Sequence, residues 1–319
     1  MAPYPLHHIT TMITRDDVVS AYRLMLEREP ENEQAIASWV ERCDSTYDLV
    51  MGVSGSEEFR GRAPHRRISG ESSTNLSPRA VAWLRDLDGI EGWLSPTAAL
   101  MSAALAQYQA GKGYRGHIAE IGVYHGKYLT GLATAVQTGE SAIAIDVFDE
   151  QAKNLDLKGY DEVGSSAIHS LTERSFLENA RKYCPDAPVR IIKRSSLDVK
   201  PADILEMGRV RFFSIDGGHT RDVLLNDLAL AEATLTPEGI ISIDDILNPQ
   251  WPGIITGAVR FMDGPTKLRP VAFITNKLLC AFEPFAKEYR DVLLDIAPKA
   301  LQRRDVEFSD HTADQYVEA

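Results

Sequence analysis

Two short apolar segments that end in acidic residues constrain this chain more than any other feature of its sequence. One reads FFSIDGGH and contains Asp216 and His219, and the other reads IISIDD and ends in Asp244 and Asp245. In a buried parallel strand, such a run crosses the core and delivers its last residues to the carboxyl edge of the sheet, where open α/β folds bind ligands. We therefore expect the three aspartates and the histidine to meet at one edge, contributed by two adjacent strands.

A group of this kind can hold a hard divalent cation, because carboxylate oxygens are the ligands that such ions prefer. An imidazole beside the ion can act as a general base. A strand-end aspartate can also simply cap the following helix or turn, and for each aspartate taken alone this alternative stays open.

The composition limits the kinds of partner. The 319 residues are 44% hydrophobic and 25% charged, which provides a sizeable core and predicts one large domain with a smaller one. The net charge of -12, from 34 Lys+Arg and 46 Asp+Glu, argues against binding to nucleic acid or to an anionic membrane. No apolar run approaches the roughly 18 residues of a membrane span.

The cysteines indicate a reducing compartment. Cys43, Cys184 and Cys280 are widely spaced and form no CxxC pattern, so we expect buried thiols. The N-terminal residues lack the apolar core of a signal peptide. We therefore expect a cytoplasmic protein, and a homo-oligomer stays open.

Residues 1–60 are expected to form a small helical domain. Thr14 precedes acidic residues and starts one helix, a second begins near Glu33, and a third covers residues 47–53. This unit resembles a domain of unknown function that is often appended to glycan-modifying enzymes; the matching positions are Tyr22, Leu26, Arg28, Pro30, Trp39 and the Ser56-Glu57-Glu58-Phe59 ending. A generic helical cap or dimerisation arm is the alternative. Residues 61–76 read as a polar linker, and residues 77–319 as one large domain.

A glycine-punctuated turn follows the first strand of the large domain. Glu120, Gly122 and Gly126 surround the point where the backbone can approach a ligand closely, and a second buried strand ends in Asp146. An acid there is placed to accept the ribose hydroxyls of an adenosine-type cofactor. A dinucleotide site would want Gly-x-Gly-x-x-Gly, which is missing, and Glu120 would repel a phosphate. An acid at position 120 instead suits the amino-acid end or the sulfonium of S-adenosylmethionine.

These motifs, Glu120-x-Gly122-x-x-x-Gly126, Asp146 and Asp216-Gly217-Gly218-His219, resemble a class I S-adenosylmethionine-dependent methyltransferase over residues 92–282. With Asp244-Asp245 and Trp251-Pro252-Gly253, the chain is similar to the metal-dependent macrolide-sugar O-methyltransferase and cephalosporin-hydroxylase group. The resemblance implies a Rossmann-like α/β fold, with a seven-stranded, mostly parallel sheet whose last strand is antiparallel.

The resemblance also implies roles for residues. Asp216, Asp244 and Asp245 would bind Mg²⁺, and His219 would be the base. Asp244 stands where relatives often have glutamate, so its shorter side chain could change the coordination. The expected cofactor-binding residues are Glu120, Gly122, Tyr124, Gly126, Asp146, Ser196 and Asp216.

The loop after Asp245 is proline-rich and aromatic, and such loops commonly select the substrate. Trp251 could stack on a sugar face or serve packing, and Asn248 and His125 are further substrate candidates. His125 could also be a second base or a cofactor-loop residue. Ser196 is assigned to the adenine, with a helix N-cap as the alternative.

The remaining segments complete the expected order of elements. A helix from Pro96 stops at Gly111, residues 237–239 stop another helix, and residues 271–282 form a hairpin that turns at Asn276-Lys277. We expect a lid over residues 148–170, and a helix plus an acidic tail after Pro284.

The sequence therefore predicts a Mg²⁺-dependent O-methyltransferase that acts on a sugar, a glycan or a glycosylated metabolite. The alternatives are an NAD-dependent oxidoreductase and a non-catalytic adenosyl-ligand-binding or scaffold protein. The expected partner is a small-molecule or glycan acceptor, with no nucleic acid and no membrane span.

Overall fold

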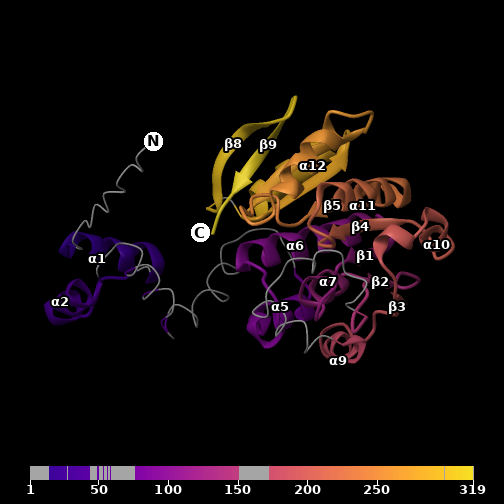
Figure 1. Ribbon diagram of the computed structural model, residues 1–319. Coiled ribbons are helices and arrows are strands. Elements are labelled where there is room, and N and C mark those ends of the chain that lie inside the picture. The colour runs from indigo at the N-terminus through magenta and orange to yellow at the C-terminus, as the bar shows by residue number, and fades with distance from the viewer. Residues whose placement is uncertain are drawn as a thin grey trace, which may run out of the picture. The chain divides into compact units, whose positions relative to one another are not determined.

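The computed structural model of the protein describes residues 14–26, 28–43, 76–150, 172–297 and 299–318, together with Leu49, Val53, Ser56 and Glu58. The chain divides into two compact units, Met1–Ser72 and Ser73–Ala319 (Figure 1). The expected linker 61–76 lies outside the described residues except for Leu76, and the expected lid lies outside them from residue 151 to its end.

The N-terminal unit begins with helix α1 (Arg15–Ala21), which Thr14 and Asp17 cap reciprocally. A π-helix (Tyr22–Leu26) and α2 (Glu33–Arg42) follow. Its core contains Val18, Val19, Tyr22, Leu26, Ile36, Leu49 and Val53. The indole of Trp39 donates to the hydroxyl of Tyr22 at 2.9 Å, and Arg28 makes two hydrogen bonds to Glu58. Four positions of the resemblance thus hold this unit together, whereas the expected helix 47–53 lies mostly outside the described residues.

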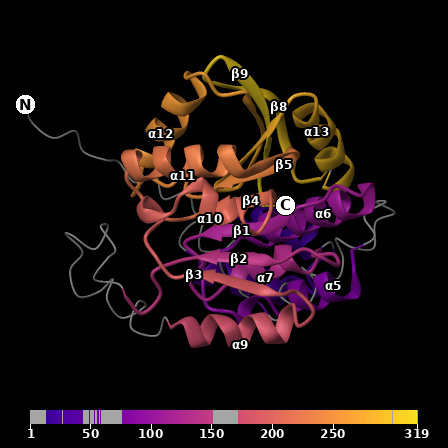
Figure 2. The same ribbon diagram turned by 90° about the vertical axis from the view of Figure 1, so that its right-hand side faces the viewer.

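A nine-stranded sheet forms the centre of the large unit, in the order β3-β2-β1-β4-β5-β7-β6-β9-β8 (Figure 2). The strands are β1 (His117–Ile121), β2 (Ala142–Ile145), β3 (Val189–Ile192), β4 (Val210–Ile215), β5 (Leu235–Ile243), β6 (Leu268–Ile274), β7 (Lys277–Phe282), β8 (Leu301–Phe308) and β9 (His311–Tyr316). The five neighbouring strands β3, β2, β1, β4 and β5 run parallel to one another, and β7 pairs antiparallel with both β5 and β6. The first seven strands are the predicted sheet, with its reversed last strand.

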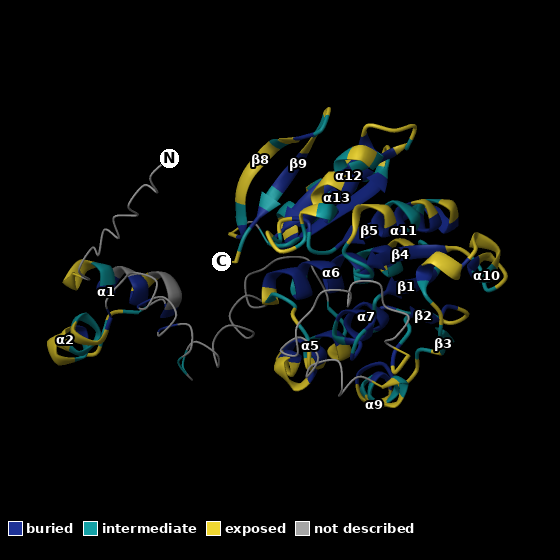
Figure 3. Cartoon of the chain, viewed as in Figure 1, coloured by how far each residue is buried: buried dark blue, intermediate teal, exposed yellow. Residues whose placement is uncertain are grey.

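Helices cover both faces of this sheet, and their apolar sides form two separate cores. The helices are α5 (Pro78–Arg85), α6 (Pro96–Lys112), α7 (Lys127–Ala133), α9 (Glu173–Tyr183), α10 (Pro201–Leu205), α11 (Arg221–Thr234), α12 (Pro252–Met262) and α13 (Phe285–Ile296). Helices α6, α7, α9 and α13 contribute to one core, and α10, α11 and α12 to the other. Figure 3 shows buried strands between helices whose outer sides are exposed.

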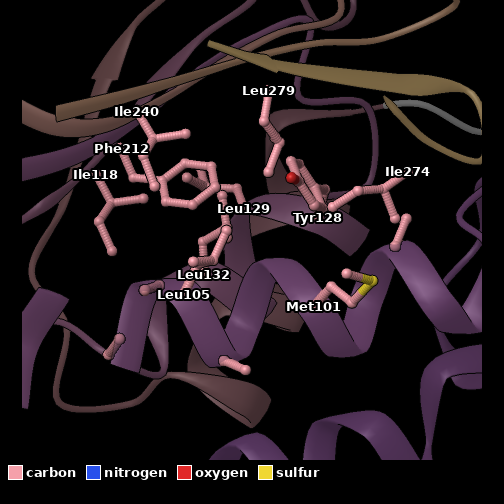
Figure 4. Close-up of a cluster of buried hydrophobic side chains, with 14 of the residues drawn as sticks. Met101, Leu105, Ile118, Tyr128, Leu129, Leu132, Phe212, Ile240, Ile274 and Leu279 are labelled. Carbon is pink, nitrogen blue, oxygen red and sulfur yellow. The ribbon is translucent and has the colours of Figure 1, made fainter. Parts of the chain in front are cut away.

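The first core shows why the strands carry β-branched and aromatic residues. Leu105 of α6 lies on the side of the strand residues Ile118 and Phe212, and Met101 of the same helix lies below Tyr128 and Ile274 (Figure 4). Met101, Leu105, Ile118 and Phe212 belong to one core. All four side chains are at most 1% exposed, and burial of each such side chain contributes about 1.5–3 kcal/mol. Among the described residues, no helix combines the length and apolar composition that a membrane crossing requires.

The expected acidic tail was wrong, because α13 is followed by the hairpin of β8 and β9. Strand β9 joins β6 in parallel, and β8 forms the edge. The sequence concealed the hairpin because β8 exposes Gln302–Asp305, so its side chains do not alternate between buried and exposed. Asp314 of the supposed tail is fully buried and forms an ion pair with Arg290 of α13.

Two smaller boundary predictions were also wrong. Helix α6 continues to Lys112 and ends at Gly113, whose φ of 79° is the left-handed conformation that glycine adopts without strain. Residues 237–239 lie inside β5 and do not form a connection before it. The register of β4 with β5 shifts there, between the pairs Val210–Leu235 and Phe212–Ile240.

A second irregularity, where β4 pairs with β1, places a charged residue inside the fold. Arg211 is the extra residue of β4 between the pairs His117–Val210 and Ile118–Phe212, and its side chain is fully buried. It pairs with Glu140 at 3.0 Å and donates to the carbonyl oxygens of Ala106 and Ala135 at 3.1 and 2.8 Å. One guanidinium thus joins β4 to the residues near the ends of α6 and α7.

We predict that Arg211→Met lowers the free energy of unfolding by about 3–5 kcal/mol, because it leaves the Glu140 carboxylate buried without its cation. Urea denaturation followed by circular dichroism measures the loss. The matched control is Arg190→Met on β3, where the side chain is exposed and we expect a change within about 0.5 kcal/mol. Equal effects of the two substitutions would contradict the structural role of Arg211.

Candidate active site

The carboxyl ends of β1, β2, β4 and β5 lie side by side. The residues that follow these strands, Gly122, Asp146, Asp216 and Asp244, therefore come to one edge of the sheet. The amide of Asp216 donates to Ile121 at 2.8 Å, and that of Asp244 donates to Ile215 at 2.9 Å. The amide of Gly122 donates to the carbonyl of β2 residue Ile145 at 3.0 Å. The prediction that the two acid-ended segments are adjacent strands is therefore confirmed, since β4 pairs with β5.

Asp216, His219 and Asp245 form a compact group at this edge. One potential ligand atom from each lies within 4.8 Å of the other two. The Nε2 atom of His219 is 3.0 Å from Asp245 Oδ2 and 4.0 Å from Asp216 Oδ1. Within the described part of the chain, this is the one group of three acidic, histidine or cysteine residues with such geometry.

Asp245 is held by residues from two loops. Its φ is 57°, and its Oδ1 accepts hydrogen bonds from the amides of Asn248 at 2.9 Å and Asn276 at 2.8 Å. Burial opposes ionisation, but the hydrogen bonds from His219 and Asn248 lower the pKa of Asp245. Asn248, expected at the substrate, thus supports a carboxylate, and the role of Asn276 was missed because sequence patterns show it only as a turn residue.

Trp251 lies against the imidazole of His219. The two rings stack with centroids 4.4 Å apart and an angle of 22°. Gly253 permits this approach, because a Cβ there would come within 2.9 Å of the backbone nitrogen of Arg221. The loop after β5 therefore fixes the plane of the histidine ring.

Asp244 is engaged differently from the other two aspartates. Its Oδ2 forms an ion pair with Lys277, and its Oδ1 accepts the backbone N–H of Asp245 at 2.8 Å. The Lys277 side chain is 5% exposed, with Nζ 4.2 Å from the ring centroid of Tyr128. Sequence reasoning placed Lys277 only in a hairpin turn, and no local pattern signals its partner. Burial and the charge of Asp244 raise the pKa of Asp216.

Glu120 faces the interior and not the open edge. Its two carboxyl oxygens accept hydrogen bonds from the Ser214 hydroxyl at 3.0 Å and from the backbone N–H of Leu129 at 3.1 Å. Burial raises its pKa to about 8. Next to it, Gly122 has a φ of 78°, and a Cβ there would lie 1.8 Å from the carbonyl oxygen of Asp216. Any side chain at position 122 would force β1 and β4 apart.

Asp146 organises the glycine turn. Its carboxylate accepts the backbone N–H of Tyr124 at 3.0 Å and of Phe148 at 2.7 Å, although burial raises its pKa. The Tyr124 ring stacks on Trp93 at 5.9 Å. Gly126, with a φ of 81°, begins α7 where a Cβ would come within 2.6 Å of Phe176.

Two other candidates lie apart from the acidic group. His125 is buried 3.5 Å from Glu91, and burial lowers its pKa. Ser196 is buried and opens the short 3-10 helix Ser196–Asp198, with its carbonyl accepting from Asn226 at 3.3 Å. The N-cap of that helix is Ser195, so the alternative role of Ser196 as the cap was wrong.

Comparison with known families identifies the central part of the large unit. Residues 119–246 match the family model described as a methyltransferase domain. This segment runs from within β1 to the residue after Asp245, and it contains both the glycine turn and the acidic group. None of the curated proteins compared with the chain matches it.

Solved structures with a similar chain path include three O-methyltransferases. NovP is 15% identical, with 59% of this chain and 80% of that chain covered and a TM-score of 0.45. CalS11, a TDP-rhamnose 3'-O-methyltransferase of calicheamicin biosynthesis, is 15% identical, with coverages of 65% and 96% and a TM-score of 0.39. TomG from Streptomyces achromogenes, in complex with SAM, is 15% identical, with coverages of 65% and 90% and a TM-score of 0.41.

We predict that Glu120→Gln changes how stability depends on pH. Glu120 has a pKa of about 8 in the folded protein and an ordinary value of 4.5, so the folded state binds more protons between these values. The wild type should therefore lose stability as pH rises from about 5 to about 8, by a few kcal/mol relative to the glutamine variant. Urea denaturation of both proteins across this range tests the prediction, and a constant difference between them would refute it.

Proposed function

We propose that this protein transfers a methyl group from S-adenosylmethionine to a hydroxyl of a sugar, a glycan or a glycosylated metabolite, with Mg²⁺ as a second cofactor; the match of residues 119–246 to the methyltransferase-domain family supports the transfer. The observation that carries the proposal is the convergence of Asp216, His219 and Asp245 at the sheet edge where the glycine turn also ends.

The cofactor half of the proposal draws on the ends of β1 and β2. Asp146 follows the second strand, where a carboxylate can accept the ribose hydroxyls of an adenosyl ligand. Gly122 and Gly126 let the backbone of the turn approach the ligand, and Tyr124 lies between them. Glu120 would act indirectly in cofactor binding, since its side chain is buried and faces the interior, whereas Asp146 is partly exposed. Ser196 stays the predicted adenine contact.

The residues fit a divalent cation. Asp216 and Asp245 offer hard carboxylate oxygens close together, which is the chemistry that Mg²⁺ prefers. When bound, the ion would lower the pKa of the acceptor hydroxyl and offset its developing charge. Asp216 would also border the cofactor, since its carbonyl oxygen contacts the position of Gly122.

His219 would be the general base that takes the proton of the acceptor hydroxyl. A sugar hydroxyl is too weak an acid to ionise unaided near neutral pH, so methyl transfer needs a base within hydrogen-bond reach. The hydrogen bond to Asp245 and the stack on Trp251 orient the imidazole. The acceptor oxygen must then approach the methyl carbon in line with the bond that breaks.

The acceptor would contact the loop after β5. Trp251 presents an aromatic surface beside His219, and aromatic rings suit the apolar face of a sugar. Asn248 would shape this surface through Asp245, and His125 stays a substrate candidate from the cofactor turn. A small-molecule or glycan acceptor in the cytoplasm is part of this proposal, and the homo-oligomer stays a prediction.

The alternatives are weaker. A nicotinamide-dependent oxidoreductase lacks support, because the family match is to a methyltransferase domain and the third glycine of a dinucleotide turn is missing. A non-catalytic adenosyl-binding protein would need neither the acidic group nor the oriented histidine.

We predict that His219→Ala lowers kcat for methyl transfer by about 10²–10⁴-fold, because general base catalysis is worth this much. Calorimetry should show nearly unchanged affinity for S-adenosylmethionine. A panel of sugar acceptors with Mg²⁺ present provides the assay, and His125→Ala serves as the control with a smaller loss. Full turnover by the His219 variant would exclude it as the base.

We predict that Asp146→Ala weakens S-adenosylmethionine binding by about 10–100-fold, since hydrogen bonds to a charged group contribute about 1.5–3 kcal/mol. Asp149→Ala, which removes an exposed carboxylate paired with Lys193, is the control and should leave affinity unchanged. Calorimetry with S-adenosylmethionine and NAD measures both. Tighter binding of NAD by the wild type would overturn the proposed cofactor.

A further inference from the structure

The antiparallel strand β7 brings a lysine to the edge where the parallel strands bring acids. Ile215 pairs with Ile243, and Ile243 pairs with Leu278. One position further along the row come Asp216, Asp244 and, because β7 runs in the opposite direction, Lys277. Since side chains alternate along a strand, Lys277 points to the face opposite Leu278, and Asp244 meets it there.

Lys277 is enclosed on that face. Its ammonium pairs with Asp244 Oδ2 and lies over the ring of Tyr128, whose hydroxyl bonds to Ser102 at 2.7 Å and Ser242 at 3.2 Å. The side chain is therefore a fixed cation among the acids of the site.

Both oxygens of Asp244 are engaged inside the protein, and one is paired with a buried cation, whereas the oxygens of Asp245 accept from two neutral amides and face His219. Oδ2 is held by Lys277, and Oδ1 accepts the backbone N–H of Asp245. Withdrawing Asp244 toward an ion would leave the ammonium buried without its partner, which is strongly unfavourable. Consistent with this, the compact group of potential ligand atoms contains Asp216, His219 and Asp245 but not Asp244.

We propose that Lys277 is a positioning residue that withholds Asp244 from the cation, so that Asp216 and Asp245 are the carboxylate ligands and the expected three-aspartate set does not form. This inference rests on the proposed function, because it concerns the same cation. It departs from the ligand set that the family resemblance implies. Asn276 has a parallel role, since it holds Asp245 from the residue next to Lys277.

The test measures Mn²⁺ binding to the full chain by calorimetry and electron paramagnetic resonance, without an acceptor. Asp216→Asn, Asp244→Asn and Asp245→Asn keep the size of each side chain. We expect Mn²⁺ affinity to fall at least 10-fold in the first and third variants. In Asp244→Asn it should stay within about 3-fold of the wild type, because the amide oxygen can still accept from Lys277.

Substitutions of the lysine give a second, independent measurement. Lys277→Met frees a carboxylate oxygen of Asp244, so Mn²⁺ should bind about 10-fold more tightly, with a changed resonance spectrum that reports a new ligand. The gain should vanish in the Lys277→Met/Asp244→Asn double variant. Lys277→Arg keeps a cation and should restore wild-type affinity. Circular dichroism establishes that each variant is folded, and if Lys277→Met is not, the aspartate series still decides.

The outcomes distinguish a failure of this inference from a failure of the proposed function. If Asp244→Asn loses Mn²⁺ as strongly as Asp245→Asn, Asp244 is a ligand and the role of Lys277 is refuted while the cation site stands. If the wild type binds no Mn²⁺, the cation in the proposed function is refuted together with this inference. Retained binding in Asp244→Asn alone among the three variants supports it.

Discussion

Carboxylates buried at a sheet edge must be paired, because an isolated charge taken out of water costs several kcal/mol. This constraint shapes the whole centre of the large unit. Glu120 bonds to β4 and α7, Asp244 pairs with Lys277 of β7, and Asp245 accepts from two asparagines. Ser214, Lys277 and Asn276 come from segments remote in sequence from the acids that they contact, so these acids can be accommodated only when the sheet has assembled around them.

The glycine turn and the acidic group lie at one edge of the sheet and are in direct contact. The absence of a side chain at Gly122 lets the carbonyl of Asp216 approach, and the carboxylate of Asp146 holds the amide of Tyr124 in the same turn. Displacement of β4 would therefore disturb both. This coupling is suited to a reaction in which a methyl donor and an acceptor oxygen must be aligned within a fraction of an ångström.

Local patterns in the sequence predicted the elements whose signal lies in one segment. Apolar runs ending in Asp216 and Asp244 gave the central strands and their common edge, and the resemblance gave the seven-stranded, mostly parallel sheet with an antiparallel last strand. The hairpin of β8 and β9 was missed because β8 is an exposed edge strand, and Asp314 reads as part of an acidic tail until Arg290 is placed beside it. The bulge that buries Arg211 was missed because the partner of Arg211, Glu140, is remote in sequence. A pairing between residues that are distant in sequence produces no pattern in either segment from which it could be predicted.

The reversal of β7 has a chemical consequence. A parallel strand reaches the carboxyl edge with its last residues, whereas an antiparallel strand starts there, so β7 can add side chains that no parallel strand supplies. Its first residue, Lys277, holds Asp244, and Asn276 of the turn before it holds Asp245. Two consecutive residues at the start of β7 thus fix the two residues that follow β5. The shorter arm of aspartate at position 244 matches this arrangement, because the carboxylate meets the lysine directly across the two strands.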